Sequence, residues 1–250
     1  EFEALLFHEA FPCLRCDVLL AVQRRGWELR QVDNATVSGV EGRSAEQRIA
    51  ISHLTDADVR VVSLGGPAGT GKTMLALAAG VEQVLDGNSK FQRVVVFRSM
   101  KAVGGEELGF LPGTAEEKLD PWLAAIYDAL EAFLPKPKIE RLKKEERIVC
   151  LPLTHLRGRT FNNSFMILDE AQNSEYTTIL TVLTRLGKNS KIVLTWDAAQ
   201  RDNLRVGRHD GISRVVQRLS GDRLFAHVAL RKSERSEVAE MAARLLDDGS

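Results

Sequence analysis

The chain has 250 residues, and its 34 basic and 34 acidic side chains give a formal net charge of zero at pH 7. This balance excludes a strongly basic protein whose overall field attracts nucleic acid, and 44% apolar residues is an ordinary content for a globular protein. No apolar run approaches the ~18 residues of a membrane span, and the first residues mix glutamates into apolar positions, unlike a signal peptide. We therefore expect a cytoplasmic protein that makes no contact with a membrane.

Patterns along the chain divide it into two parts. Residues 1–40 are predicted to form an irregular connector, or a partial small β unit, with possible strands at 17–23 and 27–32. Residues 41–250 alternate helical patterns with β-rich runs, which predicts an α/β domain with a doubly wound, mostly parallel sheet flanked by helices. The expected strands of that sheet are 59–64, 94–97, 147–150, 165–168, 191–195 and 226–229.

The three cysteines, an odd number, argue against a disulfide framework. Cys13 and Cys16 form a C-x-x-C pair, but zinc would need a second ligand pair at a workable spacing, and the sequence offers none. A reduced loop is the simpler interpretation of this pair. Cys150 lies in an apolar stretch and is expected to be a core residue.

Ser44 and Gln47 form an S-x-x-Q pattern shortly before the phosphate-binding loop described next. This pattern is a capping box at the start of a helix. The amide of Gln47 can also donate to and accept from an adenine edge, which would select ATP over GTP. The amide cannot make both sets of bonds at once, so both interpretations stay open.

A complete phosphate-binding loop of the form G-x-x-x-x-G-K-[ST] follows. Its residues are Gly66, Pro67, Ala68, Gly69, Thr70, Gly71, Lys72 and Thr73. The glycines let backbone N–H groups point at phosphate oxygens, Lys72 reaches the β- and γ-phosphates, and the Thr73 hydroxyl binds Mg²⁺. A buried strand before the loop and a helix from Met74 after it argue against a glycine-rich joint without a ligand. The sequence therefore predicts a nucleoside triphosphate site.

Basic side chains gather in the segments 136–147 and 201–218, and Arg157 and Arg159 flank Gly158. Such clusters are either solvated helix faces or contacts for a nucleic acid. The basic residues of the two segments are Lys136, Lys138, Arg141, Lys143, Lys144 and Arg147, and Arg201, Arg205, Arg208, Arg214 and Arg218. Composition alone leaves the substrate open.

Asp169 and Glu170 end the short apolar run Phe165–Leu168, as in a strand that enters a nucleotide site. Asp169 is expected to hold Mg²⁺, usually through water. Glu170 is then placed to orient and deprotonate an attacking water. The alternative is an exposed acid pair that caps a helix opening near Ala171.

Thr195, Asp197 and Gln200 follow the expected strand 191–195. Ligands of open α/β sheets bind at the carboxyl ends of the strands, so a sensor of the γ-phosphate belongs here. The alternative is that Thr195 is a helix cap.

One set of motifs occurs together in a known family. The motifs are Arg43–Gln47, Gly66–Thr73, Gly109–Gly113, Glu117-Lys118 with Pro121-Trp122, Arg157–Arg159, Asp169–Asn173, Thr195 with Asp197 and Gln200, and Ser233–Ser236. This set resembles the PhoH family of phosphate-starvation-inducible ATPases, which is related to superfamily 1 helicases. The match runs from about residue 40 to the end, and the tract 199–208 most resembles the branch in which a PIN ribonuclease domain precedes the ATPase.

The resemblance implies a RecA-like P-loop NTPase that hydrolyses ATP with Mg²⁺ and couples hydrolysis to RNA binding and unwinding. It also implies a homo-oligomeric ring, with a hexamer favoured, and an upstream PIN nuclease domain or a toxin–antitoxin partner. The alternatives are an ATP-gated RNA- or protein-binding module without processive unwinding, and a small-molecule kinase.

A ring of single ATPase domains takes its arginine finger from a neighbouring subunit. Arg235 is the first candidate and Arg231 the second, although Arg235 can equally pair with Glu234 or Glu237.

The chain departs from the family pattern in two places. Trp196 stands where the family usually has a small residue or His, and its indole could stack on a base or crowd the sensor. Arg98-Ser99-Met100 stands where many members have Arg-Pro. In addition, residues 1–40 lack the spaced acidic cluster of a PIN nuclease, so no nuclease activity is carried over.

Overall fold

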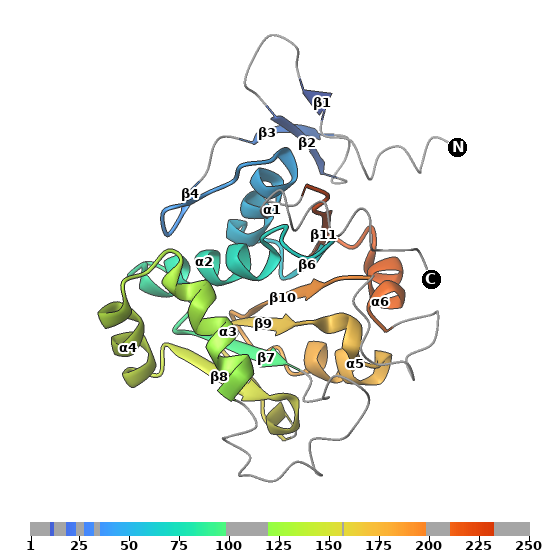
Figure 1. Cartoon of the computed structure of the whole chain (residues 1–250). Helices are drawn as coiled ribbons and strands as arrows, with labels where there is room; N and C mark the ends of the chain where they lie inside the picture. Colours follow the sequence, from blue (N-terminus) through green and yellow to red (C-terminus); the bar gives the residue numbers. More distant parts are fainter. Residues whose placement is uncertain are drawn as a thin grey trace, which may run out of the picture.

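The computed structural model describes residues 11–12, 19–23, 28–32, 36–98, 120–156, 158–198 and 211–232, and the structural statements below concern these residues. Figure 1 shows a layered body in which helices cover both faces of a central sheet. Several predicted features lie outside the described ranges, namely the Cys13–Cys16 pair, Arg157, the tract 199–208 with Gln200, and Arg235.

The central sheet has six strands in the order β11-β6-β10-β9-β7-β8, and every neighbouring pair in it is parallel. The strands are β6 (Val61–Gly65), β7 (Arg93–Arg98), β8 (Ile148–Pro152), β9 (Ser164–Asp169), β10 (Lys191–Trp196) and β11 (Phe225–Ala229). Each corresponds to one predicted strand, with ends that differ by a few residues. The doubly wound α/β fold is therefore confirmed.

The sequence of the inner strands explains their position. All six residues of β9 are buried, and β7 contributes a run of three valines and Phe97 that is buried as well. Strands that are covered on both faces read as continuous apolar runs, because neither face meets water. The β-branched valines and isoleucines of these runs also favour extended backbone.

One face of the sheet is covered by α1 (Ala45–Thr55), α2 (Lys72–Leu85), α3 (Asp120–Glu131) and α4 (Lys136–Lys144), whose apolar residues form one core cluster with the sheet. Helix α2 lies very close to the strands at Gly80, where an added Cβ would come within 2.7 Å of the Phe165 ring. The other face packs against α5 (Tyr176–Thr184) and α6 (Gly211–Leu219) in a second cluster. None of the helices in the described ranges is long and apolar enough to cross a bilayer.

A small antiparallel sheet precedes this domain, formed by β1 (Phe11–Pro12), β2 (Leu19–Gln23) and β3 (Glu28–Val32). The strands predicted at 17–23 and 27–32 are thus confirmed as β2 and β3. A hairpin of β4 (Thr36–Val37) and β5 (Val40–Glu41) follows and rests on α2, since Val37 is buried in the first core cluster and the Ser38 hydroxyl donates to Ala78 O at 3.1 Å. The domain boundary at residue 41 stays a prediction.

Lys191, the first residue of β10, is fully buried and fastens α1 to the sheet. Its Nζ donates to three carbonyl oxygens at the end of α1, those of His53 (3.0 Å), Leu54 (2.7 Å) and Asp56 (2.7 Å). A cation at the C-terminus of a helix satisfies orphan carbonyls and complements the helix dipole. Burial nevertheless lowers the pKa of Lys191 to about 7.

Candidate functional site

The loop 66–71 joins β6 to α2 at the carboxyl edge of the sheet. Gly66, Gly69 and Gly71 have φ angles of 142°, 80° and 86°, a region that side chains disfavour. At Gly66 a Cβ would lie 2.0 Å from Leu230 O, so only glycine fits. Gly71 is the N-cap of α2 and provides no side chain to its first N–H groups. The amino end of a 14-residue helix is thus left to an anionic ligand.

Lys72 is the first residue of α2, and its side chain folds back over the loop. Its Nζ donates to Gly66 O at 2.6 Å and to Pro67 O at 2.8 Å. These carbonyls hold the ammonium beside the amides that the glycines expose. A phosphate bound in the loop would meet a cation that is already in place.

Asp169 is the point where the phosphate-binding loop meets the acidic pair. Its Oδ1 accepts hydrogen bonds from Thr73 Oγ1 at 2.8 Å and from Thr195 Oγ1 at 2.7 Å. The three residues come from α2, β9 and β10, and Asp169 is only 4% exposed. Carboxylate and hydroxyl oxygens are ligands that Mg²⁺ prefers, so this donor set fits the cation that the sequence predicts. Because Thr195 lies inside β10 and bonds to Asp169, its hydroxyl does not cap a helix.

Glu170 follows Asp169 in a left-handed conformation, with φ 54° and ψ 45°. Such a backbone costs ~1–3 kcal/mol for a residue other than glycine and is common at functional sites. Glu170 is the N-cap of η4 (Ala171–Asn173), but its side chain makes no capping hydrogen bond, which removes the alternative of a helix-capping acid pair. Its carboxylate instead accepts a short hydrogen bond from Gln172 Nε2.

Two opposing influences act on the Glu170 carboxyl. Burial, and then the negative charge of Asp169, raise the pKa of Glu170 above its ordinary value. The hydrogen bond from Gln172 and the positive charges of Arg98 and Lys72 oppose this rise. A carboxylate with a raised pKa is a stronger base toward water than an ordinary surface carboxylate.

Arg98 belongs to the site, although the sequence indicated it only as a departure from the family pattern. Its Nη1 lies 3.8 Å from Asp169 Oδ2, and its side chain remains 32% exposed. Arg98 ends β7 and pairs in register with Asp169 at the end of β9. The usable signal was its position directly after the predicted strand 94–97, at the edge where ligands bind.

Gln47 makes the capping interaction and also contacts the loop. Its backbone N donates to the Ser44 hydroxyl at 3.2 Å, and its Oε1 accepts from Arg43 N at 2.8 Å. Its Nε2 donates to Thr70 O at 3.1 Å. Both ends of the buried amide therefore bind protein groups, and an adenine edge would have to displace one of them. Recognition of adenine by Gln47 stays a prediction.

Trp196 does not crowd the sensor, because successive strand residues point to opposite faces of the sheet. While Thr195 faces Asp169, the Trp196 indole donates to Ser63 Oγ at 2.9 Å and stacks on His227 with the ring centroids 5.8 Å apart. The ring on which this indole stacks is thus a histidine of β11. Asp197, directly after β10, is 5% exposed and donates its backbone N–H to Gln172 Oε1 at 3.1 Å.

The basic segment 136–147 is mostly paired with neighbouring acids. Lys136 and Glu131, Arg141 and Glu145, Lys143 and Glu140, and Arg147 and Glu145 lie 3.1–3.7 Å apart. This pairing favours a solvated helix face over a nucleic-acid contact for the segment. In the second segment, Arg214 and Arg218 lie over the ring of Tyr176.

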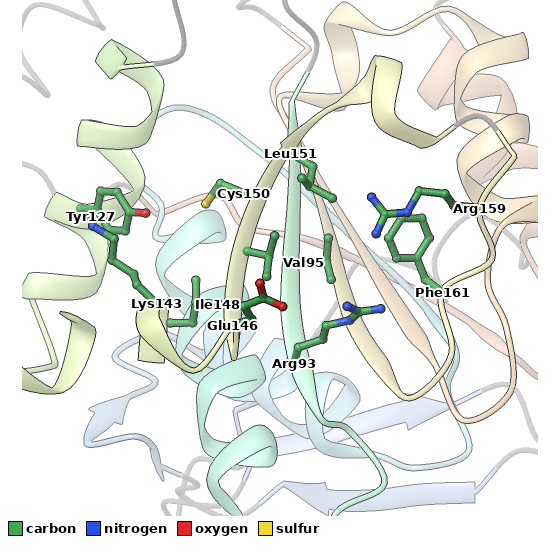
Figure 2. Close-up of a pocket in the computed structure, with 11 residues that line it drawn as sticks. Arg93, Val95, Tyr127, Lys143, Glu146, Ile148, Cys150, Leu151, Arg159 and Phe161 are labelled. Carbon is green, nitrogen blue, oxygen red and sulfur yellow. The ribbon is translucent and has the colours of Figure 1, made fainter. Parts of the chain in front are cut away.

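A separate hollow of about 350 Å³ lies at the edge strand β8. Figure 2 shows Tyr127 and Lys143 on one side of this strand and Arg159 and Phe161 on the other. Cys150 lines the hollow and packs against the core, and burial raises the pKa of its thiol to about 12, so it is not a reactive thiolate. No residue of the phosphate-binding loop or of the acid pair lines this hollow, so it is not the nucleotide site.

Comparison with known proteins places these observations in a family. The family described as "PhoH-like protein" matches residues 39–247. "Protein PhoH2" of Thermobispora bispora is 52% identical over 212 residues, which cover 85% of this chain and 48% of the relative. The protein of the same name from Mycolicibacterium smegmatis is 51% identical, with the same coverage. The chain thus spans about half the length of the curated relatives that it matches. Among solved structures, the crystal structure of Pif1 helicase from Candida albicans aligns with 81% of this chain. The alignment covers 43% of the helicase chain at 17% sequence identity, with a TM-score of only 0.40.

Proposed function

The chain is a P-loop ATPase of the PhoH family, and on this premise we propose that it couples Mg²⁺-dependent ATP hydrolysis to the binding and unwinding of RNA. The observation that carries the hydrolytic part is the direct hydrogen bond between Thr73 and Asp169. This bond supports the proposal because it joins the helix that follows the phosphate-binding loop directly to Asp169, a contact that an ATPase requires and a glycine-rich joint does not.

In this proposal the backbone N–H groups of the loop and Lys72 bind the β- and γ-phosphates of ATP. Thr73 and Asp169 would hold Mg²⁺, which when bound neutralises charge on the phosphate oxygens. Glu170 orients a water and accepts its proton as the water oxygen attacks the γ-phosphorus. The bond to the bridging oxygen breaks, and ADP and phosphate leave.

The RNA and ring parts of the proposal rest on the family resemblance. This chain spans about half the length of the relatives that it matches. The proposal therefore also includes a PIN nuclease domain, or a toxin–antitoxin partner, beside this ATPase. A homo-hexamer in the cytoplasm would supply an arginine finger from the neighbouring subunit. Arg235, which lies outside the described residues, and the exposed Arg231 are the candidates.

Steady-state ATP turnover with and without single-stranded RNA tests the proposal. We expect turnover that RNA stimulates, and a native mass that grows with ATP. Glu170→Gln should abolish hydrolysis and retain ATP binding. ATP binding without turnover in the wild-type chain would favour the binding-module alternative. ADP formation only in the presence of a small-molecule acceptor, which becomes phosphorylated, would favour the kinase.

A further inference from the structure

Gln172 connects the acid that activates water to the segment after β10. It is fully buried, and its two amide atoms bind two different parts of the site. Nε2 donates to Glu170 Oε2, while Oε1 accepts from the backbone N–H of Asp197 at 3.1 Å.

The orientation of this amide is fixed by chemistry. An ionised carboxylate only accepts hydrogen bonds and a backbone N–H only donates them, so the amide nitrogen must face Glu170 and the oxygen must face Asp197. Turning the amide over would place two acceptors together and two donors together. The two hydrogen bonds therefore have one arrangement, which links the Asp197 backbone to the Glu170 carboxylate.

The hydrogen bond from Gln172 engages one carboxylate oxygen of Glu170 and leaves the other to a different partner. Oε2 is held by Gln172, and among the described residues Oε1 accepts no hydrogen bond. The backbone of Glu170 is left-handed, with φ 54° and ψ 45°, a conformation that residues other than glycine disfavour. The hydrogen bond from Gln172 therefore fixes the orientation of a carboxylate whose residue has a strained backbone.

We propose that Gln172 is a positioning residue, which holds Glu170 in register with the segment around Asp197 so that Oε1 faces the attacking water. This inference rests on the proposed function, because it requires Glu170 to be the base. It adds a link between that base and Asp197, one of the residues predicted to act as the γ-phosphate sensor. Gln172 does not touch ATP or the water in this scheme.

The experiment measures kcat, KM and the affinity for a non-hydrolysable ATP analogue in three variants. Gln172→Leu keeps the approximate size of the side chain and removes the hydrogen bonds to Glu170 and Asp197. Gln172→Glu keeps the shape and an acceptor for Asp197 N, but its ionised form has no hydrogen to donate to Glu170 and adds a second negative charge beside it. Gln83→Leu is the matched control, because Gln83 also donates from its amide to two carbonyls, Leu54 O and Ala79 O, away from the site.

Misplacing a reacting group by about 1 Å can cost ~100-fold in rate, so we expect kcat of Gln172→Leu and Gln172→Glu to fall 10- to 100-fold. Affinity for the ATP analogue should stay within about threefold of wild type, because the loop and Lys72 are untouched. Gln83→Leu should keep wild-type kcat, whatever its change in unfolding temperature.

Two results would overturn the inference. One is a kcat for the Gln172 variants as high as that of Gln83→Leu. The other is a loss of analogue affinity in parallel with kcat, which indicates a general structural role. Glu170→Gln separates these results from failure of the proposed function: if Glu170→Gln hydrolyses ATP as fast as wild type, Glu170 is not the base at all.

Discussion

The hydroxyl of Thr195 lies 2.7 Å from Oδ1 of Asp169, and the same oxygen also accepts from Thr73. Strand β10 lies between β6, which leads into the phosphate-binding loop, and β9, which ends in the acid pair. Thr195 therefore holds the Asp169 carboxylate from the strand that lies between the loop and the acid pair, while Thr73 holds it from α2. The position of the acid depends on three segments at once.

This geometry predicts a defect in metal use when the hydroxyl is removed. Thr195→Val keeps the shape and burial of the side chain but leaves Asp169 with one hydroxyl donor. Groups that orient a metal ligand typically affect metal affinity or activity 10- to 100-fold, so the Mg²⁺ concentration for half-maximal turnover should rise by roughly tenfold. Titrating Mg²⁺ while ATP turnover is followed measures this concentration. Thr181→Val on α5, whose hydroxyl donates to Thr177 O, is the control, and equal Mg²⁺ dependence in both variants contradicts the prediction.

Replacing Arg98 at one end of β7 should reduce turnover, whereas replacing Arg93 at the other end should not. The Arg98 guanidinium lies 3.8 Å from Asp169 Oδ2 and offsets negative charge where phosphates would bind. Arg98→Ala should lower kcat/KM about tenfold, and Arg98→Lys should restore part of it. Arg93, at the other end of β7, donates to Ser164 Oγ, so Arg93→Ala should keep wild-type kinetics. Equal losses in both Ala variants would show that a local charge is not the cause.

The buried Lys191 predicts that stability depends on pH in the alkaline range. Its pKa is about 7 in the folded chain against an ordinary 10.5, so the unfolded chain binds more protons between these values. The free energy of unfolding should therefore rise with pH from about 7 to 10.5, by at most ~1.4 kcal/mol per pH unit from this group. The measurement is urea unfolding at pH 7, 8 and 9 for wild type and Lys191→Met. The variant should lack this part of the slope, and parallel curves would contradict the prediction.

The two interpretations of Gln47 predict different nucleotide preferences. If the amide mainly holds Thr70 O, Gln47→Leu should raise KM for ATP and for GTP by the same factor, because the loop that binds phosphate is displaced. If the amide reads adenine, the ratio of the two KM values should change. We expect equal factors of roughly three to ten, the cost of about one buried hydrogen bond. A selective loss for ATP would support the adenine interpretation.

Local sequence sufficed wherever the chemistry is carried by neighbouring residues. The phosphate-binding loop is contiguous from Gly66 to Thr73, and its glycines, Lys72 and Thr73 have tasks defined by their places in the motif. The buried runs of β7, β9 and β10 were recognisable because a strand covered on both faces must be apolar throughout. The order of these strands along the chain then predicted the parallel sheet.

Only the tertiary structure decided the contacts between separate segments. The Arg98–Asp169 contact depends on β7 and β9 being neighbours in register, and the three carbonyls that hold Lys191 belong to a helix more than a hundred residues earlier. Gln172 had no assigned task because its partner is a backbone N–H, which every sequence position except proline offers. Trp196 faces away from the sensor because alternate strand residues point to opposite faces, and the identity of a residue does not reveal which face it takes. The sequence determined which groups are present and the sheet they build, while strand order and register determined which groups meet.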